Sequence, residues 1–255
     1  MQNLSKLTFM MTLIVGTLLT VCSYSWVGMW IGLEINLLSI IPLMTKQNNK
    51  MESEAAMKYF ITQALASAIF LSTIILMLPT ENQMSKIQTI IINSTILTKM
   101  GAAPFHFWFP EVMEGLNWIN ATIMMTWQKI APMVIFMQSN KSLIFTSTIM
   151  IMAMIISGIM GINQTSMKKI LAYSSINHTG WMIGALMSNQ STWMIYLTIY
   201  SMMTLNVTLM MKTLNVNFLS QLINSMNNNK VMKMTFTLNF LSMGGIPPFV
   251  GFFPK

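Results

Sequence analysis

Long apolar stretches separated by short polar connections make up almost the whole sequence. A helix that crosses a bilayer needs about 20 largely apolar residues, and nine stretches fit that requirement or begin to. The predicted spans lie near residues 7–24, 26–44, 55–78, 87–109, 117–137, 143–161, 170–188 and 192–212, with a ninth over 232–255. The pattern therefore predicts an all-α fold, a polytopic bundle of transmembrane helices.

The composition agrees with that interpretation. Of the 255 residues, 54% are hydrophobic and 8% are charged, whereas soluble domains carry about 25% charged residues. Every basic residue is Lys and every acidic residue is Glu. Because nothing about a membrane protein excludes Arg and Asp, we interpret this bias as the codon usage of an AT-rich organellar gene.

Several classes of chemistry have no support in the sequence. Cys22 is the only cysteine, and a single thiol forms neither an intrachain disulfide nor an Fe–S ligand set. The two histidines lie far apart without metal-ligand spacing, and no Gly-rich nucleotide motif is present. The net charge of +8 is spread over the chain without a basic patch among aromatics. We expect no metal, nucleotide or nucleic acid to bind here.

The lysines are distributed unevenly between the two sides of the predicted membrane. The side that carries the N-terminus collects Lys6, Lys46, Lys50, Lys168, Lys169, Lys212, Lys230 and Lys233. The opposite side has only Lys86 and Lys141 in its connections. Because positive charge favours the inner side, the N-terminus is predicted to face the cytoplasm or the mitochondrial matrix.

A weak internal repeat relates two Gly/Pro/Phe-rich stretches, 100–110 and 243–254. Each stretch contains Pro-Phe, and a second proline follows five positions after that Phe. In our alignment the second stretch has one additional residue before its Pro-Phe pair. The stretches lie five spans apart and so run in opposite directions, as in inverted repeats with broken helices. Chance similarity between such segments is the alternative. A real repeat would divide the chain into 1–137 and an incomplete second unit, 143–255, of a longer protein.

Three charged residues lie at the centres of apolar spans: Glu34, Lys99 and Lys129. A charge at this depth costs at least about 2.5–3.5 kcal/mol, and such residues usually mark ion or proton pathways. Pro104 and Pro132 leave backbone carbonyls free close to the two lysines. Free carbonyls and widened turns can host water beside an ammonium group.

This constellation predicts proton transfer. Movement of Glu34 towards or away from Lys99 would make the lysine bind or release a proton. Lys129 and then Lys255, which follows Pro254, could accept it through water, with His106 and His178 as candidate relays. The alternative interpretation is a static buried ion pair.

Six stretches carry a resemblance to a known family: Trp26–Asn36, Glu54–Ser67, Lys99–Val112, Trp127–Pro132, Asn163–Gly180 and Gly244–Lys255. With these motifs the chain closely resembles the subunit 2 family of mitochondrial NADH:ubiquinone oxidoreductase (respiratory complex I), and its insect members most. The resemblance implies an antiporter-like membrane-arm subunit built on inverted five-helix repeats with broken helices. Family members continue for several helices beyond the Pro-Lys motif, so we expect this chain to be C-terminally truncated.

The resemblance also assigns roles. Glu34 matches the family's key buried glutamate and Lys99 its lysine partner, while Lys129 matches the central-axis lysine and Lys255 the lysine at the second broken helix. It implies proton translocation coupled to electron transfer from NADH to ubiquinone. It implies no cofactor in this chain, because NADH, FMN, Fe–S clusters and ubiquinone belong to other subunits.

Partners and location follow from the same resemblance. The implied partners are the other membrane-arm and accessory subunits of complex I, together with membrane lipids. The implied location is the mitochondrial inner membrane, with the N-terminus in the matrix. Two other hypotheses stay open: a stand-alone cation/proton antiporter, and a structural assembly subunit whose buried charges are static.

Overall fold

The computed structural model describes residues 2–45, 49–77, 85–139, 142–227, 230–247, 249 and 251. Within these ranges the regular elements are helices, and the all-α prediction is confirmed. The helices are α1 (Gln2–Cys22), α2 (Trp26–Met44), α3 (Lys50–Met77), α4 (Lys86–Met100), α5 (Trp108–Gly115), α6 (Trp118–Met125), the 3₁₀ turn η2 (Trp127–Lys129), α7 (Ile130–Gln138), α8 (Leu143–Ile162), α9 (Met167–Ser188), α10 (Gln190–Leu214), α11 (Leu219–Asn227) and α12 (Lys230–Gly244).

Five helices are long and apolar enough to cross a membrane, judged by length and composition. These are α1, α2, α3, α8 and α10 among the described residues. The predicted span 26–44 coincides with α2, and the predicted spans 143–161 and 192–212 lie within α8 and α10. Continuous apolar runs of this length therefore located these helices to within a few residues.

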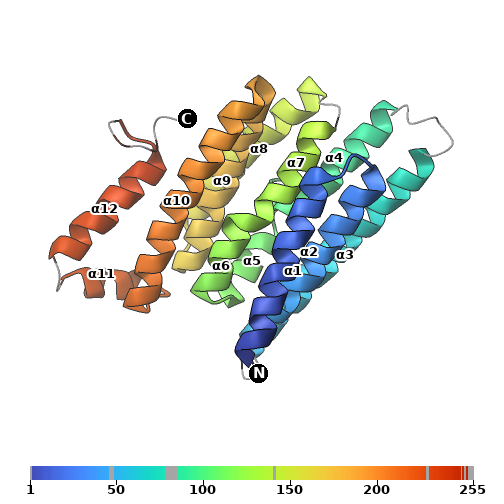
Figure 1. Ribbon diagram of the computed structural model, residues 1–255. Coiled ribbons are helices and arrows are strands. Elements are labelled where there is room, and N and C mark those ends of the chain that lie inside the picture. The colour runs from blue at the N-terminus through green and yellow to red at the C-terminus, as the bar shows by residue number, and fades with distance from the viewer. Residues whose placement is uncertain are drawn as a thin grey trace. The chain divides into compact units, whose positions relative to one another are not determined.

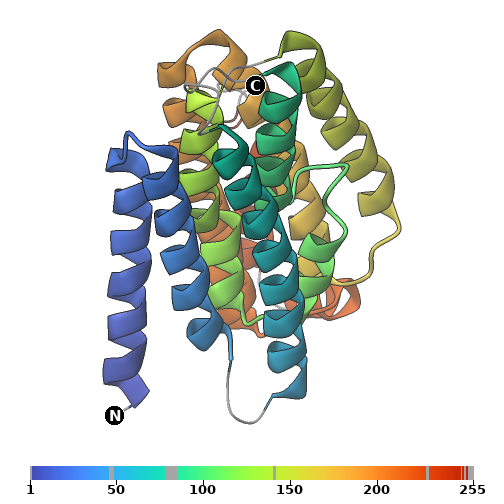
Figure 2. The same cartoon turned by 90° about the vertical axis from the view of Figure 1, so that its right-hand side faces the viewer.

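The chain forms two compact units. Unit 1 comprises Met1–Leu116 and Gln128–Ile149, and unit 2 comprises Asn117–Trp127 and Met150–Lys255. In unit 1, α2 packs against α1, α3 and α7, and α3 packs in turn against α4 and α5. Figure 1 shows α1, α2 and α3 side by side, in blue. In unit 2, α10 packs against α6, α9 and α12; Figure 2 gives the second view of the same helices.

The close packing of α1 on α2 depends on glycine. A Cβ at Gly32 would lie 2.5 Å from the Thr20 side chain and 2.9 Å from the carbonyl oxygen of Gly16. Small residues let two helices approach closely, which is a main source of helix association in lipid. Ser25, the residue directly before α2, caps that helix by accepting a hydrogen bond from the backbone N–H of Gly28.

Two predicted spans are interrupted, as the prolines beside Lys99 and Lys129 led us to expect, and one predicted connection needs correction. The segment 87–109 is not one helix, because α4 ends at Met100 and α5 begins only at Trp108. The segment 117–137 is interrupted between α6 and α7 by the 3₁₀ turn η2, which ends at Lys129. The stretch between the predicted spans 192–212 and 232–255, expected to be a polar connection, contains the helix α11, in which Leu222 and Met226 are buried one turn apart. Its Asn- and Ser-rich composition concealed that short amphipathic pattern.

The two broken-helix stretches share one backbone motif. At the end of α4, Ala102 N–H donates to the Leu97 carbonyl and Gly101 N–H to that of Thr98, both at 3.1 Å. At the end of α12, the matching bonds run from Ile246 to Leu241 (3.3 Å) and from Gly245 to Ser242 (3.1 Å). The glycines have φ of 69° and 76°. Each helix therefore ends in a Schellman motif with a left-handed glycine.

The shared motif also fixes the register between the two stretches. The next backbone bond matches as well: Phe105 N–H donates to Ala102, and Phe249 N–H to Ile246. In this register no residue is inserted, and Gly101 corresponds to Gly245, where the sequence alignment had placed Gly244. The wider division into repeats 1–137 and 143–255 stays a prediction.

Candidate proton site beside the helix break

Lys99 lies in the last turn of α4, two residues before the left-handed Gly101, and its side chain is 8% exposed. The helix end leaves the Lys99 carbonyl without its usual partner along the helix. Gln63 of α3 donates a 3.2 Å hydrogen bond from Nε2 to that oxygen. From α5, the Trp108 indole N–H donates to the Thr98 carbonyl at 3.1 Å. The neighbouring helices thus satisfy the open end of α4.

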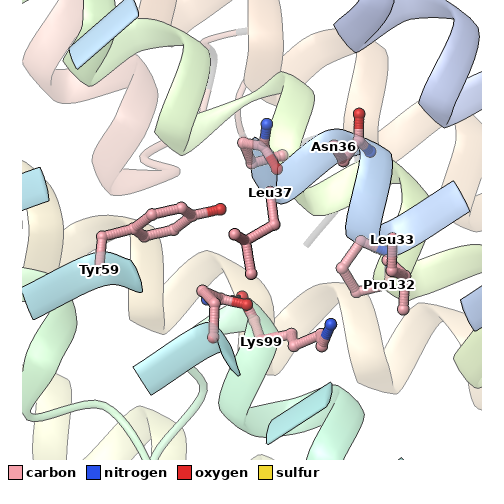
Figure 3. A pocket seen from close by; sticks show the side chains of 8 residues that line it. Leu33, Asn36, Leu37, Tyr59, Lys99 and Pro132 are labelled. Carbon is pink, nitrogen blue, oxygen red and sulfur yellow. Dashed lines mark hydrogen bonds between the residues drawn. The ribbon is translucent and has the colours of Figure 1, made fainter. Parts of the chain in front are cut away.

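A small polar cavity adjoins Lys99. Side chains from five elements of unit 1 line it: Leu33, Asn36, Leu37, Tyr59, Gln63, Lys99, Gln128 and Pro132. Figure 3 shows Tyr59, Leu37 and Lys99 converging on it from three helices. The centre of a water molecule has about 10 Å³ of space here, close to what one buried water needs.

The cavity contains amide groups that need a partner. Asn36 is 3% exposed, and both its amide nitrogen and its amide oxygen are buried without a hydrogen bond to any described residue. The amide nitrogen of Gln128 is likewise buried without a hydrogen bond to any described residue. A buried polar atom left unpaired costs about 1–3 kcal/mol, so these amides favour occupation of the cavity by water.

Glu34 lies on α2 and is half-buried. Its neighbour on the same helix, Leu33, lines the cavity together with Lys99 and Tyr59. The two charged groups are nevertheless not in direct contact, because neither ion pair found within 4.0 Å in the described chain involves them. The Oε1 atom of Glu34 is buried without a hydrogen bond to a described residue. Glu34 and Lys99 therefore lie on two helices that line one cavity, without an ion pair between them.

Lys129 is 2% exposed and ends the 3₁₀ turn η2, immediately before α7. Its ammonium nitrogen lies 5.7 Å from the centre of the Phe109 ring, a distance at which a cation is attracted to an aromatic face. Its neighbours Gln128 and Pro132 line the cavity beside Lys99. The second central lysine thus also stands where a helix is interrupted.

The remaining predicted residues lie elsewhere. His106 sits in the break after α4, 1% exposed, with Nδ1 3.3 Å from the Pro104 carbonyl oxygen. His178 belongs to α9 in unit 2, where its Nδ1 lies 2.8 Å from the Tyr196 hydroxyl. Lys255 lies outside the described residues.

Sequence reasoning did not identify Tyr59, Gln63, Asn36 or Gln128 as part of the site. A signal was present, because Asn36, Gln63 and Gln128 are amide side chains inside predicted apolar spans. For metals, the described residues contain no group of three or more His, Cys, Asp or Glu side chains arranged to hold an ion.

The relatives of this chain decide its family. A family model described as "NADH:quinone oxidoreductase/Mrp antiporter, TM" matches residues 23–255. NADH-ubiquinone oxidoreductase chain 2 of Anopheles gambiae is 48% identical, an alignment that covers 100% of this chain and 76% of the relative. The chain belongs to the NADH-ubiquinone oxidoreductase chain 2 family. Other members are that of Locusta migratoria, 44% identical with 100% and 75% covered, and that of Oryctolagus cuniculus, 38% identical with 100% and 76% covered.

Solved structures share the fold of this chain 2 family member. A chain of respiratory complex I from Thermus thermophilus with bound aureothin matches with a TM-score of 0.90 and 24% identity, covering 98% of this chain and 61% of that one. A chain of the Mrp complex from Dietzia sp. matches with a TM-score of 0.77 and 14% identity, covering 96% and 52%. The antiporter-like transmembrane fold predicted from the sequence is thereby confirmed.

Proposed function

We propose that this chain is an antiporter-like membrane-arm subunit of respiratory complex I, the H⁺-translocating NADH:ubiquinone reductase. It contributes to proton translocation across the inner membrane, coupled to electron transfer from NADH to ubiquinone. The observation that carries the proposal is the buried Lys99, which shares a water-sized polar cavity with unpaired amides and with Leu33, the neighbour of Glu34 on α2.

The fold alone does not require a lysine at position 99. In the register of the two Schellman motifs, Lys99 corresponds to Met243, which is 7% exposed at the end of α12. The same turn therefore forms with an apolar thioether at that position. Because burying an ammonium group in a membrane protein is costly, its presence in the first motif favours a functional role over a packing role.

The proposed path uses the predicted residues in order. Glu34 and Lys99 exchange affinity for one proton as the distance between them changes. A proton released at Lys99 passes through water in the cavity to Lys129, whose neighbours line that cavity. Lys255 is the proposed acceptor in the second half, with His106 and His178 as relays.

The remaining assignments belong to the same proposal. The chain consists of inverted repeats over 1–137 and 143–255, a division supported by the three successive backbone hydrogen bonds that match at the ends of α4 and α12. It holds no cofactor of its own, since NADH, FMN, Fe–S clusters and ubiquinone are handled by other subunits. It contacts other membrane-arm and accessory subunits and lipid in the mitochondrial inner membrane, with the N-terminus in the matrix.

The test is Lys129→Met in the assembled complex, with Lys86→Met as its control. Both variants replace a lysine by methionine, but Lys86 is exposed at the start of α4. We expect Lys129→Met to lower NADH-driven proton uptake into liposomes by about tenfold or more, since a relay group is lost. Lys86→Met should pump like the parent complex. A native gel stained for NADH oxidation reports assembly of each variant.

The outcomes separate the three hypotheses. Normal pumping by assembled Lys129→Met would contradict the relay role. Loss of assembly in Lys129→Met, with Lys86→Met intact, would favour the structural subunit with static charges. A parent chain that migrates alone without NADH oxidation, and exchanges cations for protons in liposomes, would favour the stand-alone antiporter.

A further inference from the structure

A buried polar cluster lies between α9 and α10 in unit 2. Its members are Ser175 and His178 on α9 and Tyr196 and Tyr200 on α10, all at most 7% exposed. The spacings of three and four residues place each pair on one face of its helix, and the two helices pack against each other. Four polar side chains thus share an otherwise apolar interface.

The contacts within the cluster hold the imidazole of His178 at two points. Its Nδ1 lies 2.8 Å from the Tyr196 hydroxyl oxygen. Its ring lies 4.9 Å, centre to centre, from the Tyr200 ring at an interplanar angle of 45°. The Tyr200 hydroxyl is itself hydrogen-bonded to the Ser175 side chain on the same helix as the histidine. One tyrosine therefore holds a ring nitrogen, while the other is anchored beside the ring face.

We propose that Tyr196 and Tyr200 are positioning residues for His178, an inference that rests on the relay role proposed for this histidine. Tyr196 holds Nδ1: in the proposed state Nδ1–H donates to the Tyr196 oxygen, so that Nε2 is the nitrogen that exchanges the proton. Tyr200, anchored by Ser175, fixes the plane of the ring. Together the two restraints keep Nε2 in one place, where it receives and releases a proton.

The proton count follows from the direction proposed for this hydrogen bond, with Nδ1 as donor and the Tyr196 oxygen as acceptor. With Nδ1–H donated to the Tyr196 oxygen, Nε2 carries the lone pair of the neutral ring. One proton arrives at Nε2 and forms the imidazolium, and one proton leaves from Nε2 and restores the neutral ring. The bond between Nδ1–H and Tyr196 persists in both states, so the ring needs no rotation between cycles.

Packing by itself would not select these two hydroxyl groups. Phenylalanine has the ring of tyrosine without the group that must find a partner when buried. A tyrosine hydroxyl directed at a histidine nitrogen and another bonded to a serine therefore bring polarity that an apolar helix interface does not need. They specify one orientation of His178.

The test is Tyr196→Phe in the assembled complex, measured as NADH-driven proton uptake into liposomes. We expect a loss of about three- to tenfold, the range that removal of one hydrogen bond commonly causes. Tyr24→Phe is the control, because it removes the same hydroxyl from a fully exposed residue of unit 1. It should pump like the parent complex.

A double-mutant cycle separates positioning from stability. A residue that acts through His178 has no further effect once that histidine is gone. We therefore expect His178→Gln to lower pumping and Tyr196→Phe to add nothing in the His178→Gln background. Additive losses, or normal pumping by Tyr196→Phe alone, would overturn the positioning role while leaving the relay role intact. Normal pumping by His178→Gln would instead remove the relay role on which the inference rests.

Tyr200→Phe gives an independent test should Tyr196→Phe prevent assembly. It keeps the ring that lies beside His178 and removes only the bond to Ser175. The same absence of any added loss in the His178→Gln background is expected. Additive losses in this second cycle would overturn the proposal.

Discussion

Gln63 Nε2 donates a hydrogen bond of 3.2 Å to the carbonyl oxygen of Lys99, joining α3 to the interrupted end of α4. The oxygen is one that the helix end leaves unpaired, and the bond keeps it satisfied within the membrane. Both residues line the same cavity. The bond therefore couples the position of the buried lysine to a neighbouring helix.

The first prediction concerns this bond. Gln63→Leu leaves the Lys99 carbonyl without a partner, which costs about 1–3 kcal/mol for a buried acceptor. We expect a lower thermal stability of the purified complex and slower NADH-driven proton uptake, because the end of α4 loses its anchor. Gln190→Leu, at an exposed position, is the control. Unchanged stability and pumping in Gln63→Leu would show that the bond has no role.

Much of the fold could be predicted from the sequence, because helices in lipid must be long, apolar and internally hydrogen-bonded. From that constraint the apolar run predicted a helix over 26–44, and the structure has α2 over Trp26–Met44. It also identified Glu34, Lys99 and Lys129, since a charge inside such a run is conspicuous. The prolines correctly indicated that helices near the two lysines are interrupted.

Other features depend on contacts between distant segments and leave no local pattern. Pro104 indicated an interruption of the helix near that residue. The helix α4 nevertheless ends earlier, at Met100, because Gly101 adopts a left-handed conformation and closes the Schellman motif. Tyr59 and Gln63 belong to the site because α3 packs against α4. The helix α11 was missed because its two buried residues stand among Asn and Ser.

The second prediction concerns the charge coupling between Glu34 and Lys99. Glu34→Gln and Lys99→Met should each lower proton pumping by about tenfold or more, since each removes one member of a proton-exchanging pair. Because the two residues act as a unit, the double variant should lose little more than either single variant. The measurement is proton uptake per NADH oxidised, with assembly followed on native gels.

A matched control exists for each charge. Glu54→Gln removes a carboxylate from the exposed start of α3, and Lys86→Met removes an exposed lysine. Both should leave pumping unchanged. Additive losses in the Glu34→Gln, Lys99→Met double variant would mean that the two residues work independently.

The third prediction concerns a surface clamp between α3 and α5. Lys58 lies 3.1 Å from Glu54 on its own helix and 3.0 Å from Glu111 on α5. All three side chains are well exposed, so salt screens these pairs and their contribution is small. Lys58→Met should slightly lower the melting temperature at low salt, and the difference should vanish at high salt. A loss that persists at high salt would indicate that the lysine acts through packing of its aliphatic stem.

The last prediction tests the helix break itself, through paired glycine substitutions. Gly101 has φ of 69°, and a Cβ added there would lie 3.0 Å from the Cβ of Phe109. Gly101→Ala therefore meets both backbone strain of about 1–2 kcal/mol and crowding against α5, and should destabilise the purified complex. Gly158→Ala changes a helical glycine of α8 with nothing within 4 Å of the added carbon.

Gly158→Ala should be neutral or stabilising by up to about 1 kcal/mol, since alanine favours a helix over glycine. Gly245→Ala separates the backbone strain at Gly101 from the crowding against α5. The φ angle of Gly245 is 76°, and the residue occupies the same place in the second Schellman motif. Equal losses at positions 101 and 245 would assign the effect to the left-handed backbone. A larger loss at 101 would assign the excess to contact with Phe109, and would show that α5 holds the break beside Lys99 in place. The melting temperatures of the three variants, measured under identical detergent conditions, give this comparison. A Gly101→Ala variant as stable as the parent complex would contradict the predicted destabilisation.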